Sequence, residues 1–329
     1  MTSLTPDEYQ AWLSSGDVAR DATSEPVGRL LLVSGPGPSG NTARPGTEAF
    51  ASLPCITVAV AHGDRCATEP WHQLADIVIR PDDVDLLIES VSRAPIAATA
   101  LALLLRSTGQ RDVGDGLVEE SATYSMLQAS PEFQRWLTAR PKKTRSEGDE
   151  PAVRFWREGD VLHVRLFRPR VHNALNRRMR DDLLVALAVA RADPSLRVEL
   201  TGEGPSFCAG GDLDEFGSFS DVGSAHAVRL AGSVGRVLSM LATRTTARIH
   251  GACMGSGIEL PAFAGTVVAA PTTRVRLPEL ELGLIPGAGG TVSLPRRIGR
   301  HRTAFLGLTG ATIGAATAHR WHLVDAIES

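Results

Sequence analysis

The sequence predicts an α/β protein in which strands and helices alternate. After residue 150, apolar stretches with strand periodicity are each followed by a helical pattern. Glycine-rich turns follow two of these strands, SFCAGGDL at residues 206–213 and HGACMGSG at residues 250–257. The composition, 43% hydrophobic and 22% charged, is that of a chain that buries a core. A mainly disordered chain is therefore excluded.

The first 83 residues predict short buried strands joined by turns. Strands are expected at residues 30–33, 56–61 and 75–79, and a short helix at residues 6–13. Residues 1–28 are polar and turn-rich, so they are expected to be peripheral. The segment GPGPSG at residues 35–40 fits a GxGxxG pattern, but its two prolines remove N–H donors that a phosphate needs. We therefore interpret this segment as a loop.

Residues 82–140 have a helical pattern. Helices are expected at residues 86–90, 96–106, 117–127 and 133–137, followed by a charged linker with glycine and proline at residues 142–151. The apolar run at residues 95–105 is about half of the ~20 residues that cross a bilayer. No membrane helix is therefore expected. The first twenty residues contain acids and no apolar stretch, so no secretory signal is expected and a cytoplasmic location is predicted.

The second half repeats strand, turn and helix. A half-buried strand is expected at residues 162–166, and Asn176 is the expected N-cap of a helix that Pro194 closes. Further strands are expected at residues 197–200, 246–249 and 266–270. Repetition of this unit predicts a right-handed α/β arrangement.

The charge and the cysteine pattern exclude several classes of partner. The chain has 34 basic and 37 acidic residues, and residues 1–150 carry a formal net charge of −8 against +5 for residues 151–329. No cationic field indicates a nucleic-acid partner, and an anionic ligand is expected on the second half. The four cysteines form no CxxC pair and the nine histidines form no ligand cluster. No metal is expected.

The glycine-rich turns and two glutamates are the candidate chemistry. Small residues let a ligand approach backbone N–H groups, so the two turns together could bind an anionic oxygen; the alternative is tight packing without a ligand. Glu259 and Glu279 lie among apolar neighbours, which is costly unless the carboxyl group is paired, protonated or catalytic. Stabilisation of a helix start is the alternative for Glu259.

Four segments together resemble the crotonase superfamily, the enoyl-CoA hydratases and isomerases. They are RPRVHNALN (168–176), SFCAGGDL (206–213), HGACMGSGIEL (250–260) and LPELELGLIPGAGGT (277–291). The resemblance implies a ββα spiral core that binds acyl-CoA thioesters and stabilises an enolate. It implies that the backbone N–H groups of Ala209 and Ser256 form the oxyanion hole, that Glu259 holds and activates water, and that Glu279 delivers a proton. Two carboxylates sharing one water would titrate as a coupled pair.

The same resemblance implies the rest of the site. Coenzyme A would lie along residues 168–174, with Arg168 and Arg170 supplying charge. No separate cofactor is implied, and the expected assembly is a homotrimer or a pair of trimers, with no nucleic-acid or membrane partner. The full set of expected substrate-binding residues is Arg168, Arg170, His172, Ala174, Gly210, Gly211, Asp212 and Gly255.

The sequence departs from the family pattern in several ways. Ser256 replaces the usual glycine, Pro261 follows Glu259 closely, and His322 stands where a glycine ends the helix. Residues 86–140 look like the C-terminal helices of the family, displaced ahead of the core, and they are expected to pack over the active site. This divides the chain into a degraded half-repeat (1–83), a helical segment with linker (84–146) and a catalytic core (147–329). The rivals to a hydratase are an isomerase, a thioester hydrolase and a catalytically silent protein.

Overall fold

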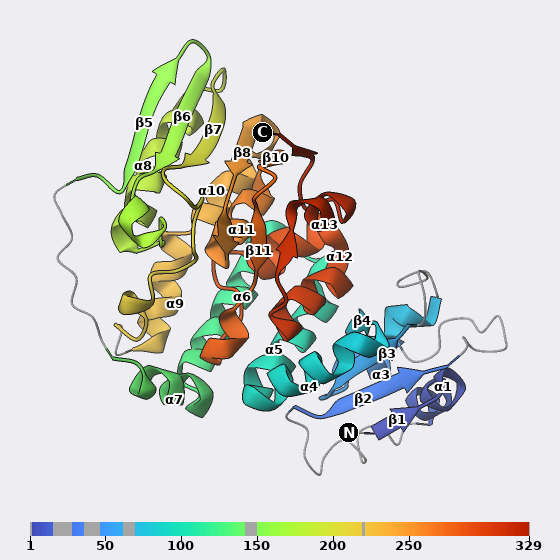
Figure 1. The fold of residues 1–329 in the computed structure, drawn as a ribbon. Helices are drawn as coiled ribbons and strands as arrows, with labels where there is room; N and C mark the ends of the chain where they lie inside the picture. Colours follow the sequence, from blue (N-terminus) through green and yellow to red (C-terminus); the bar gives the residue numbers. More distant parts are fainter. Residues whose placement is uncertain are drawn as a thin grey trace.

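The computed structural model describes residues 2–15, 28–35, 47–61, 70–141, 150–218 and 221–328. Figure 1 shows a small sheet near the N-terminus, a layer of helices beside it, and a larger sheet region that contains the C-terminus. The GPGPSG segment after Gly35 and most of the expected linker, residues 142–149, lie outside the described residues.

The first sheet is parallel and has the strand order β1-β2-β3-β4. Its strands are β1 (Thr2–Leu4), β2 (Leu30–Ser34), β3 (Ile56–Val60) and β4 (Ile77–Ile79), with helices α1 (Pro6–Ser14) and α3 (Thr47–Ser52). The prediction that residues 1–28 are only peripheral was wrong, because β1 joins the sheet and Tyr9 of α1 is fully buried. Three residues are too few to show strand periodicity in the sequence.

A buried ion pair fixes this sheet to the helices that follow. The Asp76 carboxylate lies 2.8 Å from Arg106 and also accepts a hydrogen bond from the backbone N–H of Thr57 in β3. Both charged side chains are almost completely buried: Asp76 is 1% exposed and Arg106 is 4% exposed. Removal of either partner would leave an uncompensated charge, so this pair fixes α5 relative to the sheet.

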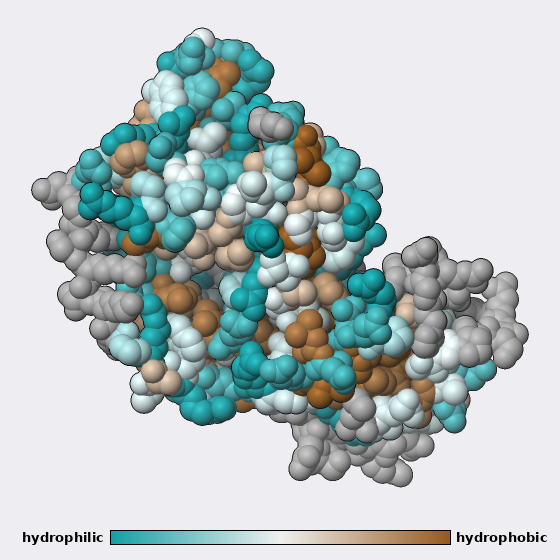
Figure 2. All heavy atoms as spheres, viewed as in Figure 1, coloured by the Kyte–Doolittle hydropathy of each residue, from teal (hydrophilic) through white to brown (hydrophobic). Residues whose placement is uncertain are grey.

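Four helices form the middle layer, as the sequence predicted: α4 (Val84–Arg93), α5 (Pro95–Arg106), α6 (Val113–Gln128) and α7 (Pro131–Ala139). Glu132 of α7 accepts hydrogen bonds from the N–H groups of Ile96 and Ala97 at the start of α5, where helical N–H groups have no internal partner. Figure 2 shows hydrophobic residues on this face around α4 and the first sheet, and Leu86 and Leu103 are among the exposed apolar side chains.

The second half contains two sheets, and the chain passes repeatedly from one to the other. The six-stranded sheet has the order β13-β10-β8-β7-β6-β5 and the three-stranded sheet the order β12-β11-β9. From β8 the chain enters β9, and from β10 it enters β11, so successive turns of the chain add one strand to each sheet. This is the ββα spiral that the family resemblance implied. The strands are β5 (Val153–Glu158), β6 (Val161–Leu166), β7 (Arg197–Gly202), β8 (Thr245–Ile249), β9 (Ala252–Met254), β10 (Thr266–Ala269), β11 (Arg274–Arg276), β12 (Ile313–Gly314) and β13 (Ala326–Ile327).

The helices of the second half pack on these sheets. They are α8 (Arg177–Ala192), α9 (Val222–Ala231), α10 (Val234–Met240), α11 (Ser256–Glu259), α12 (Gly290–Thr309) and α13 (Ala315–Arg320). The Asn176 side chain caps α8 by accepting from the N–H of Met179, as predicted. Single 3₁₀ turns lie at Pro70–Leu74, Pro81–Asp83, Thr108–Gln110, Pro169–Val171, Leu213–Glu215, Ala242–Arg244, Pro261–Phe263 and Glu279–Leu282.

Two local predictions need correction. The sequence suggested a helix after SFCAGGDL, but only a 3₁₀ turn follows there. The helix after HGACMGSG, α11, has four residues, and the chain then forms a 3₁₀ turn that starts at Pro261. Proline has no N–H and its ring disfavours a continuing α-helix, which explains the early end. His322 adopts the left-handed conformation expected of it, with φ 64°.

Helix α12 joins the two halves. Its Arg300 donates hydrogen bonds to the backbone carbonyls of Ala75 and Gln73, and the Leu101 side chain of α5 packs against its Gly307. In the part of the chain that the structure describes, no single helix is long and apolar enough to span a membrane. The helices at residues 81–93 and 95–106 reach the required length and apolarity only when they are taken together, and the chain bends by 112° between them.

Candidate active site

Glu259 and Glu279 converge on one glycine. Gly255 has φ 48° and ψ −120°, a conformation that glycine adopts without strain. A Cβ atom at this position would lie 2.3 Å from Oε1 of Glu279 and 3.7 Å from Oε1 of Glu259. The two carboxyl groups therefore face the same small space, which the absence of a side chain at Gly255 keeps open.

The turn before α12 holds the Glu259 carboxylate. Its Oε2 accepts hydrogen bonds from the N–H groups of Ala288 and Gly290, both at 2.8 Å. A Cβ on Gly290 would lie 2.6 Å from Cγ of Glu259, so glycine is required for this close approach. Glu259 is 2% exposed, and its backbone carbonyl accepts from the Ser293 hydroxyl at 2.8 Å. Its position is therefore fixed by groups on α12.

Glu279 has a different environment. It begins the 3₁₀ turn Glu279–Leu282, and its Oε2 is buried without a hydrogen-bond partner among the described residues. An unpartnered buried oxygen disfavours the ionised carboxylate, because no donor replaces the lost water. The two glutamates therefore differ: Glu259 accepts two N–H groups, whereas Glu279 has an oxygen with none.

A third carboxyl group, Glu120 of α6, lies beside this pair. It is 2% exposed and accepts hydrogen bonds from the Gly289 N–H at 2.7 Å, the Thr291 N–H at 2.8 Å and the Thr291 hydroxyl at 2.7 Å. Glu120 and Glu259 thus bind alternate N–H groups of the same turn. Residues 86–140 were predicted to pack over the two glutamates, and the structure places Glu120 of α6 on the turn that also holds Glu259; the sequence did not single out Glu120.

Burial raises the pKa of all three carboxyl groups. Burial is the main cause for Glu259, whose pKa rises to about 7 although the N–H groups of Ala288, Gly290 and Gly287 oppose the shift. Burial and the charge of Glu259 raise the pKa of Glu120 to about 8. Burial, followed by the charge of Glu259, raises the pKa of Glu279 well above its usual value. Near neutral pH the three neighbouring carboxyl groups therefore do not all ionise together, and Glu279, which has an oxygen without a donor, favours its protonated form.

The two predicted oxyanion donors are not equivalent in the structure. The Ser256 N–H, at the start of α11, has no hydrogen-bond partner within the described residues. The Ala209 N–H instead donates to the backbone carbonyl of His172 at 2.9 Å. The predicted oxyanion role of the Ala209 N–H stays a prediction, and in this structure the carbonyl of the loop that contains His172 occupies that N–H. His172 and its neighbour Asn173 both have left-handed φ values, 52° and 54°.

The predicted coenzyme A loop is partly used for internal contacts. Arg168 pairs with Asp212 at 3.0 Å and donates to the carbonyl of Ala174. Its charge and that of Asp212 offset each other, so the charge that the prediction assigns to Arg168 already has an internal partner. Arg170 is exposed and has no ion pair among the described residues, which leaves it as the available charge. His172 is exposed and its Nδ1 lies 3.0 Å from the Ser206 hydroxyl.

Gly210 and Gly211, which were predicted to bind substrate, lie so close to neighbouring atoms that a side chain at either position has little room. Gly210 has φ 99°, and a Cβ there would lie 3.2 Å from the Met254 carbonyl oxygen. A Cβ on Gly211 would lie 2.9 Å from the Phe216 ring. Both positions thus bring the SFCAGGDL turn close to its neighbours whether or not a ligand binds.

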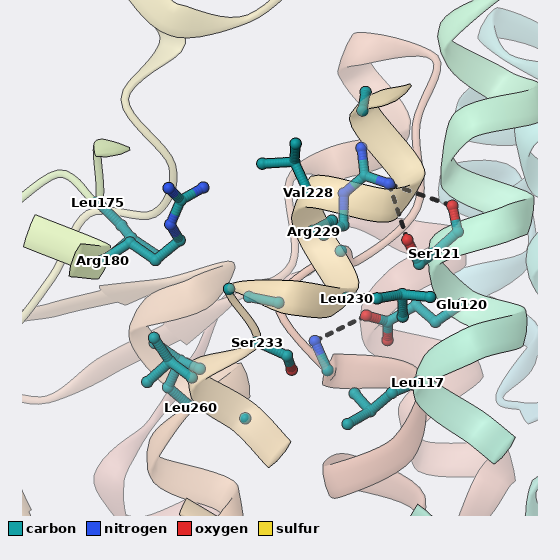
Figure 3. A pocket seen from close by; sticks show the side chains of 17 residues that line it. Leu117, Glu120, Ser121, Leu175, Arg180, Val228, Arg229, Leu230, Ser233 and Leu260 are labelled. Atoms are coloured by element: carbon teal, nitrogen blue, oxygen red, sulfur yellow. Dashed lines mark hydrogen bonds between the residues drawn. The ribbon is translucent and has the colours of Figure 1, made fainter. Parts of the chain in front are cut away.

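A pocket of about 170 Å³ opens next to these carboxyl groups. Figure 3 shows side chains from α6, α8 and α9 around it, with Glu120 on its wall. The backbone of Gly287, Ala288 and Gly289, which binds Glu120 and Glu259, forms another part of the wall. Leu117, Leu175 and Leu260 give it an apolar lining. In the described part of the chain no group of three His, Cys, Asp or Glu residues could hold a metal ion.

Comparison with known proteins identifies the family of the second half. The sequence model of the enoyl-CoA hydratase/isomerase family matches residues 157–329, just over half of the chain. The chain belongs to the enoyl-CoA hydratase/isomerase family. Solved structures agree: an enoyl-CoA hydratase from Thermoplasma volcanium is 32% identical, with a TM-score of 0.51, and covers 54% of this chain and 72% of its own.

Several curated members of the family are similar to the same half. A mevalonyl-coenzyme A hydratase from Beauveria bassiana is 34% identical over 51% of this chain and 63% of its own length. A probable enoyl-CoA hydratase from Mycobacterium bovis is 34% identical over 52% of this chain and 66% of its own. An enoyl-CoA isomerase/hydratase from Mycosarcoma maydis is 35% identical over 50% of this chain and 64% of its own. The chain therefore matches less than two thirds of each of these relatives.

Replacing Glu120 with alanine is expected to destabilise the protein. The change leaves the N–H groups of Gly289 and Thr291 and the Thr291 hydroxyl without their acceptor. We expect a loss of about 3 kcal/mol in the free energy of unfolding, measured by urea titration. Glu119→Ala is the matched control, because this neighbouring side chain is 41% exposed and pairs with Arg111 on the surface. Equal stability of both variants would contradict the assigned role of Glu120.

Proposed function

We propose that the chain is a hydratase that adds water across the 2,3 double bond of a 2-enoyl-CoA thioester. The observation that carries the proposal is the convergence of Glu259 and Glu279 on the space beside Gly255, one residue before the unpartnered N–H of Ser256. Hydration needs a base that activates water, an acid that supplies a proton and a donor for the thioester oxygen, all within one site. Family membership supports an acyl-CoA thioester as the substrate.

The roles follow from the two environments. The Glu259 carboxylate, held by two N–H groups, accepts a proton from water while the water oxygen bonds to the β-carbon. Electrons move to the thioester oxygen, which accepts a hydrogen bond from the Ser256 N–H. Glu279, protonated because its Oε2 has no donor, gives its proton to the α-carbon. One water is added, and a proton passing from Glu259 to Glu279 restores the starting state.

The Ala209 N–H serves as a second donor in this proposal only after the His172 carbonyl turns away from it. His172 and Asn173 both have left-handed φ values, and the Asn173 amide holds the loop by donating to the carbonyls of Glu203, Ser206 and Phe207. Turning the His172 carbonyl away is therefore a backbone rearrangement that substrate binding must drive. Arg170 is the proposed contact for the coenzyme A phosphates.

The test of the proposed function is a hydration assay with crotonyl-CoA and longer 2-enoyl-CoA thioesters. Loss of the enoyl absorbance together with a product heavier by one water supports a hydratase. A product of unchanged mass indicates an isomerase, and release of free coenzyme A indicates a thioester hydrolase. Coenzyme A binding without turnover of any thioester indicates a silent protein, the alternative that the occupied Ala209 N–H favours.

The pH dependence of hydration is expected to be bell-shaped. Glu259 must be ionised, and its pKa is raised to about 7, so kcat/KM should fall as the pH decreases below 7. Glu279 must be protonated, and its pKa is raised well above the usual value, so kcat/KM should fall again when high pH removes its proton. Rate measurements from pH 5 to about 10 test this. A profile that is flat below pH 7 would exclude Glu259 as the base.

We also propose that the protein works as a cytoplasmic trimer or pair of trimers. The support for the trimer is the membership of the core in the enoyl-CoA hydratase/isomerase family. Light scattering of the purified protein measures the mass of the assembly in solution. A monomer that hydrates its substrate at full rate would contradict this proposal.

A further inference from the structure

The pocket beside the carboxyl groups contains two arginines. Arg180 of α8 and Arg229 of α9 line it together with apolar side chains, and Figure 3 shows both guanidinium groups at the pocket. Among the described residues that line the pocket, Glu120 is the sole acid. Its two oxygens already accept three hydrogen bonds from Gly289 and Thr291. The pocket therefore carries positive charge that its own walls do not offset.

Arg229 is a half-buried cation with neutral partners. Its Nη1 donates to the Ser121 hydroxyl at 2.9 Å and the Ser125 hydroxyl at 3.1 Å, and its Nη2 donates to the Gln128 side-chain oxygen at 3.0 Å. The guanidinium carbon lies 4.4 Å from the centre of the Tyr124 ring. No carboxylate of the described chain forms an ion pair with it, and burial lowers its pKa. Fixed orientation without a counter-anion is what an anion-binding arginine requires.

Arg180 supplies a second charge. Among the described residues it pairs only with its sequence neighbour Asp181, at 2.7 and 2.9 Å, and that carboxylate is 53% exposed. Exposed pairs of this kind are weak, so Arg180 can accept a stronger partner at little cost. Its side chain lies against Gly232, where a Cβ would be 3.1 Å from the Arg180 Nε. Glycine at this position leaves the room that the arginine occupies on the pocket wall.

We propose that this pocket receives an acyl chain that ends in a carboxylate, so that the substrate is the coenzyme A thioester of an unsaturated dicarboxylic acid. One end of the pocket borders Gly287, Ala288 and Gly289, the turn whose N–H groups hold Glu259, which is the base in the proposed function on which this inference rests. The leucines contact the methylene groups, and the distal carboxylate pairs with Arg180 and Arg229. A guanidinium matches a carboxylate with two parallel hydrogen bonds, which neutral acyl chains cannot form.

The test compares three thioesters of equal chain length: 2-hexenoyl-CoA, the coenzyme A thioester of 2-hexenedioic acid, and its methyl ester. We expect the wild-type kcat/KM for the free acid to exceed that for the ester at least ~10-fold. Arg229→Gln and Arg180→Gln should each remove most of this preference and leave hydration of 2-hexenoyl-CoA within ~2-fold of wild type. Arg236→Gln is the matched control, because Arg236 is exposed on α10 and does not line the pocket.

Several results would overturn the proposal. A wild-type protein without preference for the free acid contradicts it, as does an equal loss on all three thioesters, which would indicate that the arginines bind coenzyme A or only stabilise the fold. If no thioester is hydrated, the proposed function fails, and measurements of thioester binding then test the proposed carboxylate site separately. Adipyl-CoA should then bind more tightly than hexanoyl-CoA, and both arginine variants should remove that difference. Thermal unfolding of each variant shows that it is folded.

Discussion

Glu279→Gln is expected to lower the hydration rate at least ~100-fold while the protein stays folded. Glutamine keeps the size and polarity of the side chain but has no acidic proton to give to the α-carbon. Because Oε2 of Glu279 is buried without a partner among the described residues, little internal bonding is lost in the variant. Turnover should therefore fall in kcat, with KM changed much less.

The stability of this variant separates a catalytic role from a structural one. Burial raises the pKa of Glu279 in the folded state, so folding favours its protonated form and stability falls as the pH rises above the unfolded pKa. A neutral glutamine removes that cost. Glu279→Gln should consequently be at least as stable as wild type at pH 8. Glu281→Gln, two residues away, 41% exposed and paired with Arg276, is the control that should retain activity. Unchanged kinetics of Glu279→Gln would remove Glu279 from the mechanism.

Local sequence signals predicted the elements that have a clear periodicity or cap. The alternation at residues 162–166 became β6, and Asn176 became the cap of α8. Strand β1 was missed because three residues have no measurable period. Strand β5 was missed although it contains Val153, Phe155 and Trp156, because five of its six residues are exposed and its apolar side chains do not mark a buried face. Glycine turns with strand signals predicted an α/β arrangement, and the family resemblance implied the spiral, but neither predicted that α11 ends as early as Glu259.

The candidate site was predictable only where its residues carry a linear motif. Glu259 and Glu279 stand in recognisable segments, and the structure brings them together at Gly255. Glu120 belongs to a helix that is more than a hundred residues away in sequence, and its neighbour Glu119 is an ordinary exposed acid. Only tertiary packing distinguishes the two. The pairing of Arg168 with Asp212 and the capture of the Ala209 N–H by His172 are likewise contacts between separate loops.

Removal of residues 1–150 is expected to abolish both folding and activity. Helices α5, α6 and α7 contact the core at three glycines, where a side chain on the glycine would collide with the helix. A Cβ on Gly307 would meet Leu101, and a Cβ on Gly287 would meet the Tyr124 ring. A Cβ on Gly283 would lie 2.7 Å from the backbone nitrogen of Phe133. These close contacts cover the stretch from Glu279 to α12 that positions the Glu259 and Glu279 carboxyl groups.

A chain that begins at Pro151 would expose this stretch to water. The turn before α12 would lose the Glu120 carboxylate, which accepts from Gly289 and Thr291, and Glu259 depends on the same turn for its two N–H donors. Apolar side chains of α12 that now pack against α5 and α6 would form an exposed patch, which promotes aggregation. We expect an insoluble product, or a soluble one without hydration activity. Circular dichroism measures the folding of the product, and the hydration assay measures its activity.

Adding back residues 70–141 as a separate chain should restore solubility in part, because the contacts are side-chain and backbone packing that needs no covalent link. A stable and active protein without residues 1–150 would show that the first half is an independent module and that the helices do not complete the site.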